Sequence, residues 1–251
     1  MSRRSSNNLE FLIKAFGMLT YWFFLALAYI LIIVVRIVIF LVSIVIFYSS
    51  KYKKKTGNGY FKTIFDKGCY GEYLLYRKVK KVLDPDAIIL NAYLPSENEN
   101  LEDAEIDLIA VSHKYVYCFE MKNYKGRIFG FYEENYWTQF FNSVRQYSFY
   151  NPIKQNEGHM NAIENYLFVD RNYIVPIVVF ANKTDISKVI GSGVIKIKDV
   201  KEYILDYETR GKERFGDAQV EKYINKLNEA ANVSPETVNK HIEEVREIKR
   251  Y

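Results

Sequence analysis

The sequence predicts an α/β domain, built on a mixed β-sheet with helices on both sides, that follows a single transmembrane helix. Three observations predict this architecture. Nearly every residue from Leu19 to Tyr48 is apolar. After that stretch, a helical pattern is followed by several strand patterns, a second helix and a further strand. The strand pattern at Ile174–Phe180 is apolar throughout, which is typical of strands that are buried on both faces.

The apolar stretch from Leu19 to Tyr48 is interrupted only by Thr20, Arg36 and Ser43. As a helix it would be about 45 Å long, more than the hydrocarbon core of about 30 Å. One tilted helix is favoured over two spans, because neither Gly nor Pro lies near Arg36 to form a turn. A cleaved signal peptide fits poorly, because its apolar region would be shorter and a small-residue cleavage site would follow.

The formal net charge of +5 comes from the anchor. Residues 1–56 contain eight cationic side chains and one acidic side chain, a net charge of +7, so the remainder carries −2. Lysines beside anionic lipid explain this balance, and net charge excludes no substrate. The four lysines at 51–55 outnumber the three cations before the span, and two cysteines make no disulfide framework. The following domain is therefore expected in the cytoplasm, on a single-pass membrane protein.

The remaining elements are predicted from periodicity and turn residues. A polar linker is expected at 51–60 and a helix at about 70–83, which Asp84-Pro85 ends. Asn151-Pro152 opens another helix as the cap and the first helical residue. Strands are predicted at 87–94, 105–112, 115–121, 127–132, 136–140, 174–180 and 194–197, and helices after that. The expected organisation is anchor and linker at 1–56, a central domain at 57–185 and a mostly helical extension at 186–251.

The two strands that flank His113-Lys114 form an expected hairpin. A tight turn there makes the numbers of paired residues sum to 227, which sets Asp107 opposite Glu120. Lys122 lies two residues after Glu120 and points the same way. A shift of one residue would undo this pairing. The pattern therefore brings two carboxylates and an amine to one end of a buried hairpin.

Two carboxylates this close disfavour joint ionisation unless a cation lies between them. Asp107, Glu120, the backbone carbonyl of Met121 and water molecules would suit Mg²⁺ or Mn²⁺, and Lys122 could orient an attacking water. The structural alternative is an ion pair of Asp107 with Lys122 and a strand-end Glu120 near solvent. Glu72 lies on the apolar stripe of the first helix, where it is either a helix-dipole acid or a third carboxylate of the metal site.

Five separate motifs in order resemble the NERD (nuclease-related) domain family, over roughly residues 60–185. They are Lys67-Gly68-Cys69-Tyr70-Gly71-Glu72, Glu105-Ile106-Asp107, Glu120-Met121-Lys122-Asn123-Tyr124-Lys125-Gly126-Arg127-Ile128-Phe129-Gly130, Trp137, and Asn151-Pro152-Ile153-Lys154-Gln155 with His159. NERD domains are similar to the PD-(D/E)xK nucleases, which implies a restriction-endonuclease-like fold.

The resemblance also implies roles for individual residues. Asp107 and Glu120 would be the metal carboxylates and Lys122 the catalytic lysine. Glu72 would be the acid of the first helix, and Gln155 the helix-borne polar residue beside the site. Ile106 stands where the superfamily has proline, but proline is not needed for metal binding.

Other candidates keep a structural alternative. Trp137 stacks a base or anchors the sheet, and the anchoring role is favoured. His159 is expected on the helix surface or behind the ligands, rather than on the metal. Lys125 and Arg127 contact phosphates or are solvated strand residues. The stripe of Val238, Ile242, Val245 and Ile248 docks on the domain or mediates homo-oligomer formation.

The expected function is a membrane-anchored nuclease that hydrolyses DNA phosphodiester bonds with Mg²⁺ or Mn²⁺. RNA as substrate, and endonuclease or exonuclease action, stay open. Its expected partners are DNA and the lipid bilayer. The first rival is a catalytically silent module that binds nucleic acid or a protein partner at the membrane, and the second is a membrane scaffold. The domain charge of −2 favours a silent module a little, and the intact set of Asp107, Glu120 and Lys122 favours the enzyme.

Overall fold

The computed structural model describes residues 2–97, 101–142 and 145–248. The chain forms two compact units, Met1–Lys51 and Tyr52–Tyr251. The first unit is helix α1 (Ser2–Ser49), which runs through Arg36 without a break. Its segment Lys14–Ser49 is long and apolar enough to cross a membrane, and the mean hydropathy reaches 3.4 over 18 of its residues. The expectation of one continuous helix is therefore confirmed.

The second unit is mixed α/β, as predicted. Its helices are α2 (Tyr52–Thr56), α3 (Tyr60–Phe65), α4 (Lys67–Val79), α5 (Pro152–Leu167), α6 (Val200–Arg210), α7 (Asp217–Ala231) and α8 (Pro235–Ile248), with short 3-10 turns η1 (Pro85–Ala87), η2 (Arg171–Tyr173) and η3 (Ile197–Asp199). Its strands are β1 (Ile88–Pro95), β2 (Asp103–Val111), β3 (Val116–Lys122), β4 (Gly126–Phe131), β5 (Tyr136–Phe140), β6 (Gln146–Tyr150), β7 (Ile174–Phe180), β8 (Thr184–Ile190) and β9 (Val194–Lys196).

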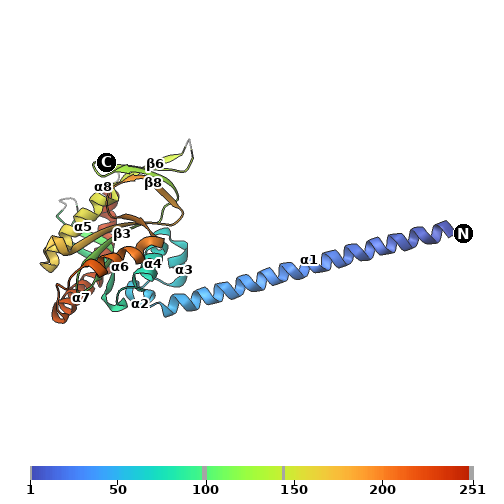
Figure 1. The fold of residues 1–251 in the computed structure, drawn as a ribbon, viewed down its shortest axis with the longest axis horizontal. Coiled ribbons are helices and arrows are strands. Elements are labelled where there is room, and N and C mark those ends of the chain that lie inside the picture. Colours follow the sequence, from blue (N-terminus) through green and yellow to red (C-terminus); the bar gives the residue numbers. More distant parts are fainter. Residues whose placement is uncertain (1, 98–100, 143–144, 249–251) are drawn as a thin grey trace. The chain divides into compact units, whose positions relative to one another are not determined.

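The strands form two mixed sheets rather than one (Figure 1). The main sheet has the order β1-β2-β3-β7-β9, in which β1, β2 and β3 are antiparallel neighbours and β7 runs parallel to β3. The second sheet has the order β6-β5-β4-β8. The main sheet carries the hairpin of β2 and β3, and its pairs Val111↔Val116 and Leu108↔Phe119 confirm the expected register.

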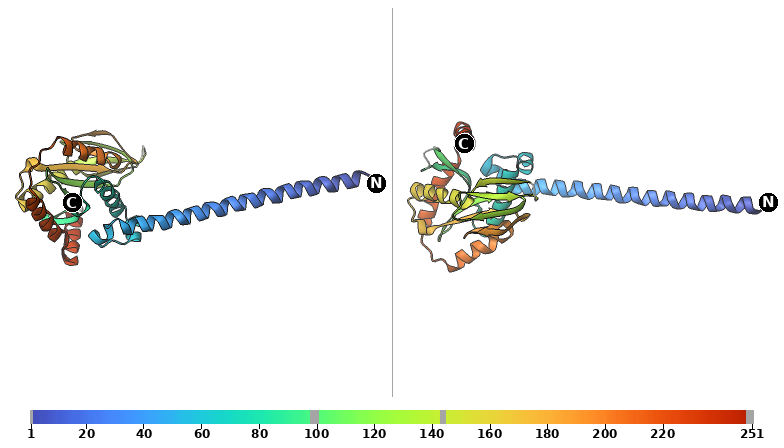
Figure 2. Two further views of the ribbon diagram at one scale, coloured as in Figure 1. Left: turned by 60° about the horizontal axis from the view of Figure 1, so that its bottom comes forward. Right: turned by 90° about the horizontal axis from the view of Figure 1, so that it is seen from above.

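Helices cover both faces of the main sheet, and two adjacent residues of β3 identify which helix lies on which face. Cys118 bonds Asn156 of α5, with Sγ 2.9 Å from Oδ1. The neighbouring Tyr117 donates its hydroxyl to Glu208 of α6 at 2.6 Å. Successive strand residues point to opposite faces, so α5 and α6 lie on opposite sides. Helices α4 and α6 pack together, and α7 shares the core cluster of α5. The further views in Figure 2 show helices on either side of the strands of the second unit.

The second sheet joins the main one through a small apolar cluster of Ile128, Trp137, Ile153, Val178 and Phe180. Trp137 is fully buried and donates its indole N–H to the Phe131 carbonyl at 2.9 Å. A Cβ at Gly130 would meet the Trp137 ring at 2.2 Å. Position 130 must therefore be glycine, because any side chain would overlap the Trp137 ring. Trp137 anchors the second sheet, which is the favoured of its two expected roles.

Candidate active site

The end of the β2–β3 hairpin departs from regular pairing at Asp107. The ladder with β3 stops at Leu108↔Phe119, and the ladder with β1 omits Asn91 and Asp107 while it resumes at Ala92↔Ile106. Asn91 has a left-handed backbone with φ 52°, which asparagine tolerates better than most residues. The regular alternation of side chains between the two faces of β2 that we expected is therefore wrong at this point. It would put Ile106 and Ile109 on opposite faces, whereas both belong to one core cluster.

Asp107 uses its side chain where the ladder is interrupted. Its Oδ2 accepts a hydrogen bond from the Met121 backbone N–H at 2.6 Å, so the carboxylate is fixed to β3. Burial, and then the charges of Glu120 and Glu72, raise the pKa of Asp107 well above its usual range, although Lys122 and the Met121 N–H oppose the rise. Ionising Asp107 beside these acids is therefore costly without a cation.

The even-numbered residues at the end of β3 meet α5 one after another. Cys118 contacts Asn156, Glu120 lies with its Oε2 3.5 Å from Nδ1 of His159, and Lys122 donates to Oε1 of Gln155 at 3.0 Å. Asn151 caps this helix by accepting from the Ile153 N–H at 2.9 Å. The predicted helix start therefore aligns the side chains of α5 with those of β3.

Lys122 pairs with Glu120 and not with Asp107. Its Nζ lies 2.5 Å from Oε1 of Glu120, a carboxylate that is only 2 % exposed. Burial lowers the pKa of Lys122, but the charge of Glu120 and those of Tyr124 and Asp107 outweigh burial and leave it raised. The ammonium form is thus held in place between Glu120 and Gln155. Glu120 is also not the solvent-facing strand-end residue that the structural alternative required.

Glu72 lies close to Asp107 from the side of α4. Helix α4 begins at the Asp66 cap, whose carboxylate accepts from the Cys69 N–H at 2.9 Å. Its Gly71 is in close contact with β3 and the residue after it, since an added Cβ would lie 3.1 Å from Cε of Met121 and 2.8 Å from Cβ of Asn123. Burial raises the pKa of Glu72 to about 7, against a hydrogen bond from Asn91 that lowers it. Glu72 is a half-buried acid of the site, and it is not a solvated first-turn acid.

A chain of polar contacts behind Glu72 was not foreseen from the sequence. The Tyr52 hydroxyl and the Asn91 amide each lie 3.4 Å from Oε2 of Glu72. Asn91 also reaches Oε1 of Glu105 at 3.5 Å, and the Tyr93 hydroxyl donates to that oxygen at 2.8 Å. The only sequence signal for this row of polar contacts was Glu105, which belongs to a motif. The tyrosines and Asn91 looked like ordinary strand or linker residues.

The donor set fits a divalent cation that keeps water ligands. Within the described ranges, Oε2 of Glu120 is buried without a hydrogen-bond partner, and the charge of Glu120 helps to raise the pKa of Asp107. Among the described residues, no group of three His, Cys, Asp or Glu side chains is arranged to hold a metal. Mg²⁺ and Mn²⁺ accept two carboxylates with a carbonyl and water, so the two acids fit better than a closed three-residue cage would.

The remaining candidates have structural partners. His159 is buried in α5 beside Glu120, not on the helix surface, and burial lowers its pKa. Arg127 pairs with Asp185 at 2.7 Å. Lys125 is exposed, with its Nζ 5.5 Å from the centre of the Phe141 ring.

Residues 67–181 match the family model described as NERD, nuclease-related domain. The uncharacterized protein pXO1-01 of Bacillus anthracis is 36% identical over 98 residues, which cover 39% of this chain and 45% of that protein. The chain thus spans less than half the length of this curated relative. No solved structure matches the present chain. The matched segment contains Glu72, Asp107, Glu120, Lys122 and Gln155.

Proposed function

We propose that this chain, whose residues 67–181 form a nuclease-related domain, is a membrane-anchored nuclease that hydrolyses DNA phosphodiester bonds with Mg²⁺ or Mn²⁺. The observation that carries the proposal is the convergence of Asp107, Glu120 and Lys122, where one buried oxygen of Glu120 has no hydrogen-bond partner in the part of the chain that the structure describes. RNA is the alternative substrate of the same chemistry.

In this proposal Asp107, Glu120 and the Met121 carbonyl would hold the metal. Glu72, expected from the sequence as a third metal carboxylate, lies near enough to raise the pKa of Asp107, and it would add negative charge beside the metal rather than complete a three-carboxylate cage. The bound ion would supply Lewis acidity at the phosphoryl group. Lys122 carries an ammonium that can orient a water and offset negative charge developing on the phosphate. Gln155 positions that ammonium from α5 through its 3.0 Å hydrogen bond.

Two substitutions test the proposal in the full chain, purified in a nonionic detergent. Lys122→Met and Asp107→Asn remove the charge and keep much of the side-chain shape. Loss of one acid–base or metal group should slow plasmid cleavage by about 100-fold or more. Lys188→Ala, which changes an exposed lysine of β8, is the control and should cut like the wild type.

A second candidate is a silent module that binds nucleic acid or a protein partner at the membrane. It is favoured by the ion pair of Lys122 with Glu120, which already neutralises one of the two acids. If the wild type and both variants leave plasmid DNA equally intact with either metal ion, the silent module replaces the nuclease.

The anchor belongs to the proposal as well. We assign α1 as a single membrane span because of its length and apolar composition, and we place the second unit in the cytoplasm. The lysines after the span favour that side, since positive residues are retained there.

A further inference from the structure

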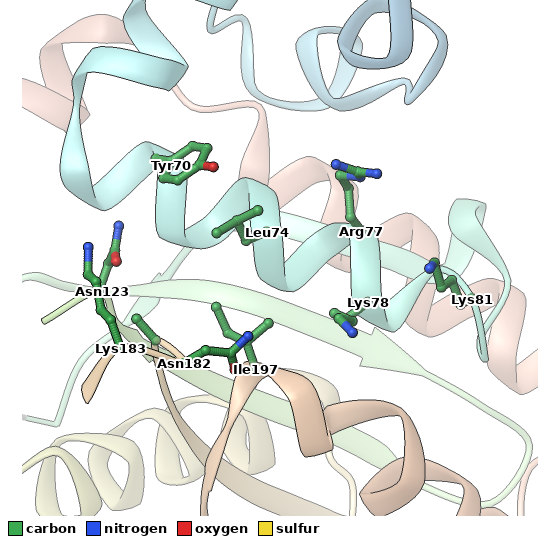
Figure 3. Close-up of a pocket in the computed structure, with 10 residues that line it drawn as sticks. Tyr70, Leu74, Arg77, Lys78, Lys81, Asn123, Asn182, Lys183 and Ile197 are labelled. Atoms are coloured by element: carbon green, nitrogen blue, oxygen red, sulfur yellow. The ribbon is translucent and has the colours of Figure 1, made fainter. Parts of the chain in front are cut away.

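A pocket of about 380 Å³ lies beside the candidate active site, between α4 and the segment that follows β7 (Figure 3). Its wall carries four cationic side chains: Arg77, Lys78, Lys81 and Lys183. No acidic residue is among the residues that line it. This cationic pocket stands out because residues 57–251 together carry a net charge of −2 by the sequence.

One wall of the cationic pocket is a stripe along α4. Tyr70, Leu74 and Lys78 recur every fourth residue, and Lys81 follows three positions later in the turn after the helix. Residues spaced by three or four lie on one face of a helix. Figure 3 shows these side chains in a row along the helix, with Asn123 and Lys183 across from its start.

Helix electrostatics explains only part of this arrangement. Cations in the last turn of a helix are favoured by its dipole, which accounts for Arg77 and Lys78. It does not account for Lys183, which comes from the loop between β7 and β8. The concave shape is not explained either, because solvated cations that only stabilise a helix need no pocket.

The lining matches one unit of a nucleic-acid strand. Lysine and arginine side chains with the amides of Asn123 and Asn182 are donors suited to phosphate oxygens. Leu74 and Ile197 provide an apolar surface for sugar or base edges. The volume lies in the range of about 300–1,000 Å³ that is usual for ligand pockets.

The cationic pocket adjoins the proposed catalytic residues on two elements. Asn123 directly follows Lys122, and the Ala181 N–H bonds the Lys122 carbonyl at 3.2 Å. Tyr70 precedes Glu72 by two residues on α4. The side chain of Lys122 points toward α5, whereas the cationic pocket lies on the side of α4 at the same end of β3. A DNA strand with one phosphate at Lys122 would therefore reach the pocket around this end of β3 with its neighbouring phosphates.

We propose that the cationic pocket binds the phosphodiester backbone of DNA next to the bond that is cut. The inference rests on the proposed function, since it names the surface that would hold the same substrate. Lys78, Lys81 and Lys183 are the phosphate contacts, and they act through charge rather than base identity.

The test is DNA binding by the full chain in nonionic detergent, with chelator and without metal, so that no cleavage takes part. The probe is a short fluorescent DNA duplex, and its dissociation constant is measured between about 50 and 200 mM salt. The pocket variant is Lys78→Ala/Lys81→Ala/Lys183→Ala. The matched control is Lys188→Ala/Lys212→Ala/Lys222→Ala, which removes the same number of charges from exposed positions of β8, the loop after α6, and α7.

The pocket variant should bind the duplex about tenfold or more weakly than the control, and its salt slope should fall by about 2–3. Equal affinity and an equal salt slope for the two variants would overturn the proposal that the cationic pocket binds DNA. Thermal unfolding of both variants near the wild-type temperature shows that a loss of binding is not a loss of folding.

The outcome is separable from that of the nuclease proposal. A chain that cuts DNA but binds it equally well in both variants refutes the pocket and keeps the nuclease. A chain that binds DNA through the pocket without cutting it refutes hydrolysis and supports a DNA-binding surface.

Discussion

Glu72 sets a pH dependence of stability at the scale of one residue. Its pKa is raised to about 7 in the folded protein, mainly by burial, from an ordinary value of 4.5. The folded state therefore holds a proton that the unfolded state has lost between these values, so stability falls as pH rises from about 4.5 to 7. Glu72→Gln removes this penalty, and Tyr52 and Asn91 still find an acceptor oxygen.

We expect metal-free Glu72→Gln to be more stable than the wild type at pH 8, by about 1–3 kcal/mol, or a few degrees in Tm. At pH 4.5 the two proteins should unfold at nearly the same temperature. Thermal unfolding in chelator at both pH values measures this difference. A variant that is less stable than the wild type at pH 8 would contradict the assignment of Glu72 as a penalised acid.

The parts of the site that could be predicted from the sequence are those that follow from hairpin register and from helix caps. The turn at His113-Lys114 gave the hairpin register, and Asn151 gave the start of the helix that carries Gln155. The partner of Lys122 was not predictable, because the interruption at Asn91 and Asp107 changes which acid meets it. Such an interruption depends on backbone conformation, and a pattern of alternating residue types does not record it.

The contact of α4 with β3 is the feature at the scale of elements that positions Glu72. Gly71→Ala would place a Cβ 2.8 Å from Cβ of Asn123 and 3.1 Å from Cε of Met121. Met121 is the residue whose N–H fixes Asp107. We expect the variant to lose about 1–3 kcal/mol of stability from overpacking, and plasmid cleavage to fall with it.

Gly158→Ala is the matched control for that substitution. Gly158 lies within α5, is exposed, and an added Cβ would meet nothing within 4 Å. Replacing it by alanine should raise stability by about 0.5–1 kcal/mol, because alanine favours the helix. Denaturant unfolding of both variants checks the pair. Shifts in the same direction would show that the α4–β3 contact is not as tight as described.

The elements that sequence reasoning missed are those with little buried surface or with tyrosines in polar surroundings. Strands β6 and β8 lie on the two edges of the second sheet, and most of their residues are exposed or half-buried. Their apolar alternation is therefore weak. The expected linker at 51–60 is wrong, since it contains α2 and the start of α3, whose Tyr52 and Tyr60 are buried.

At the scale of the whole molecule, the net charge of the domain does not show how charge is distributed over its surface. The domain's charge of −2 argued mildly against nucleic acid, yet Arg77, Lys78, Lys81 and Lys183 line one pocket. Lys183 is about a hundred residues from the α4 stripe in sequence, so only the fold brings them together. Conversely, the acids that dominate elsewhere include Glu72, Asp107 and Glu120, whose negative charge a bound cation would offset.

Cationic side chains lie before, within and after the apolar helix, and they bear on the last two predictions. An arginine at mid-depth costs about 2.5–3.5 kcal/mol to insert, which the surrounding Leu, Ile, Val and Phe outweigh at about 0.3–0.6 kcal/mol each. The full chain, produced in a bacterial host, should therefore stay with membranes in high salt and leave them in detergent. A chain released by salt alone would be peripheral, and the anchor would be refuted.

Orientation follows from the lysines at 51, 53, 54 and 55, which outnumber Arg3, Arg4 and Lys14. Protease added to intact spheroplasts should leave a C-terminal tag untouched and digest it after lysis. Changing the four lysines to glutamine leaves the positive excess before the span, so a fraction of chains should invert and expose the tag. Digestion of the wild-type tag in intact spheroplasts would place the second unit outside, away from cytoplasmic DNA.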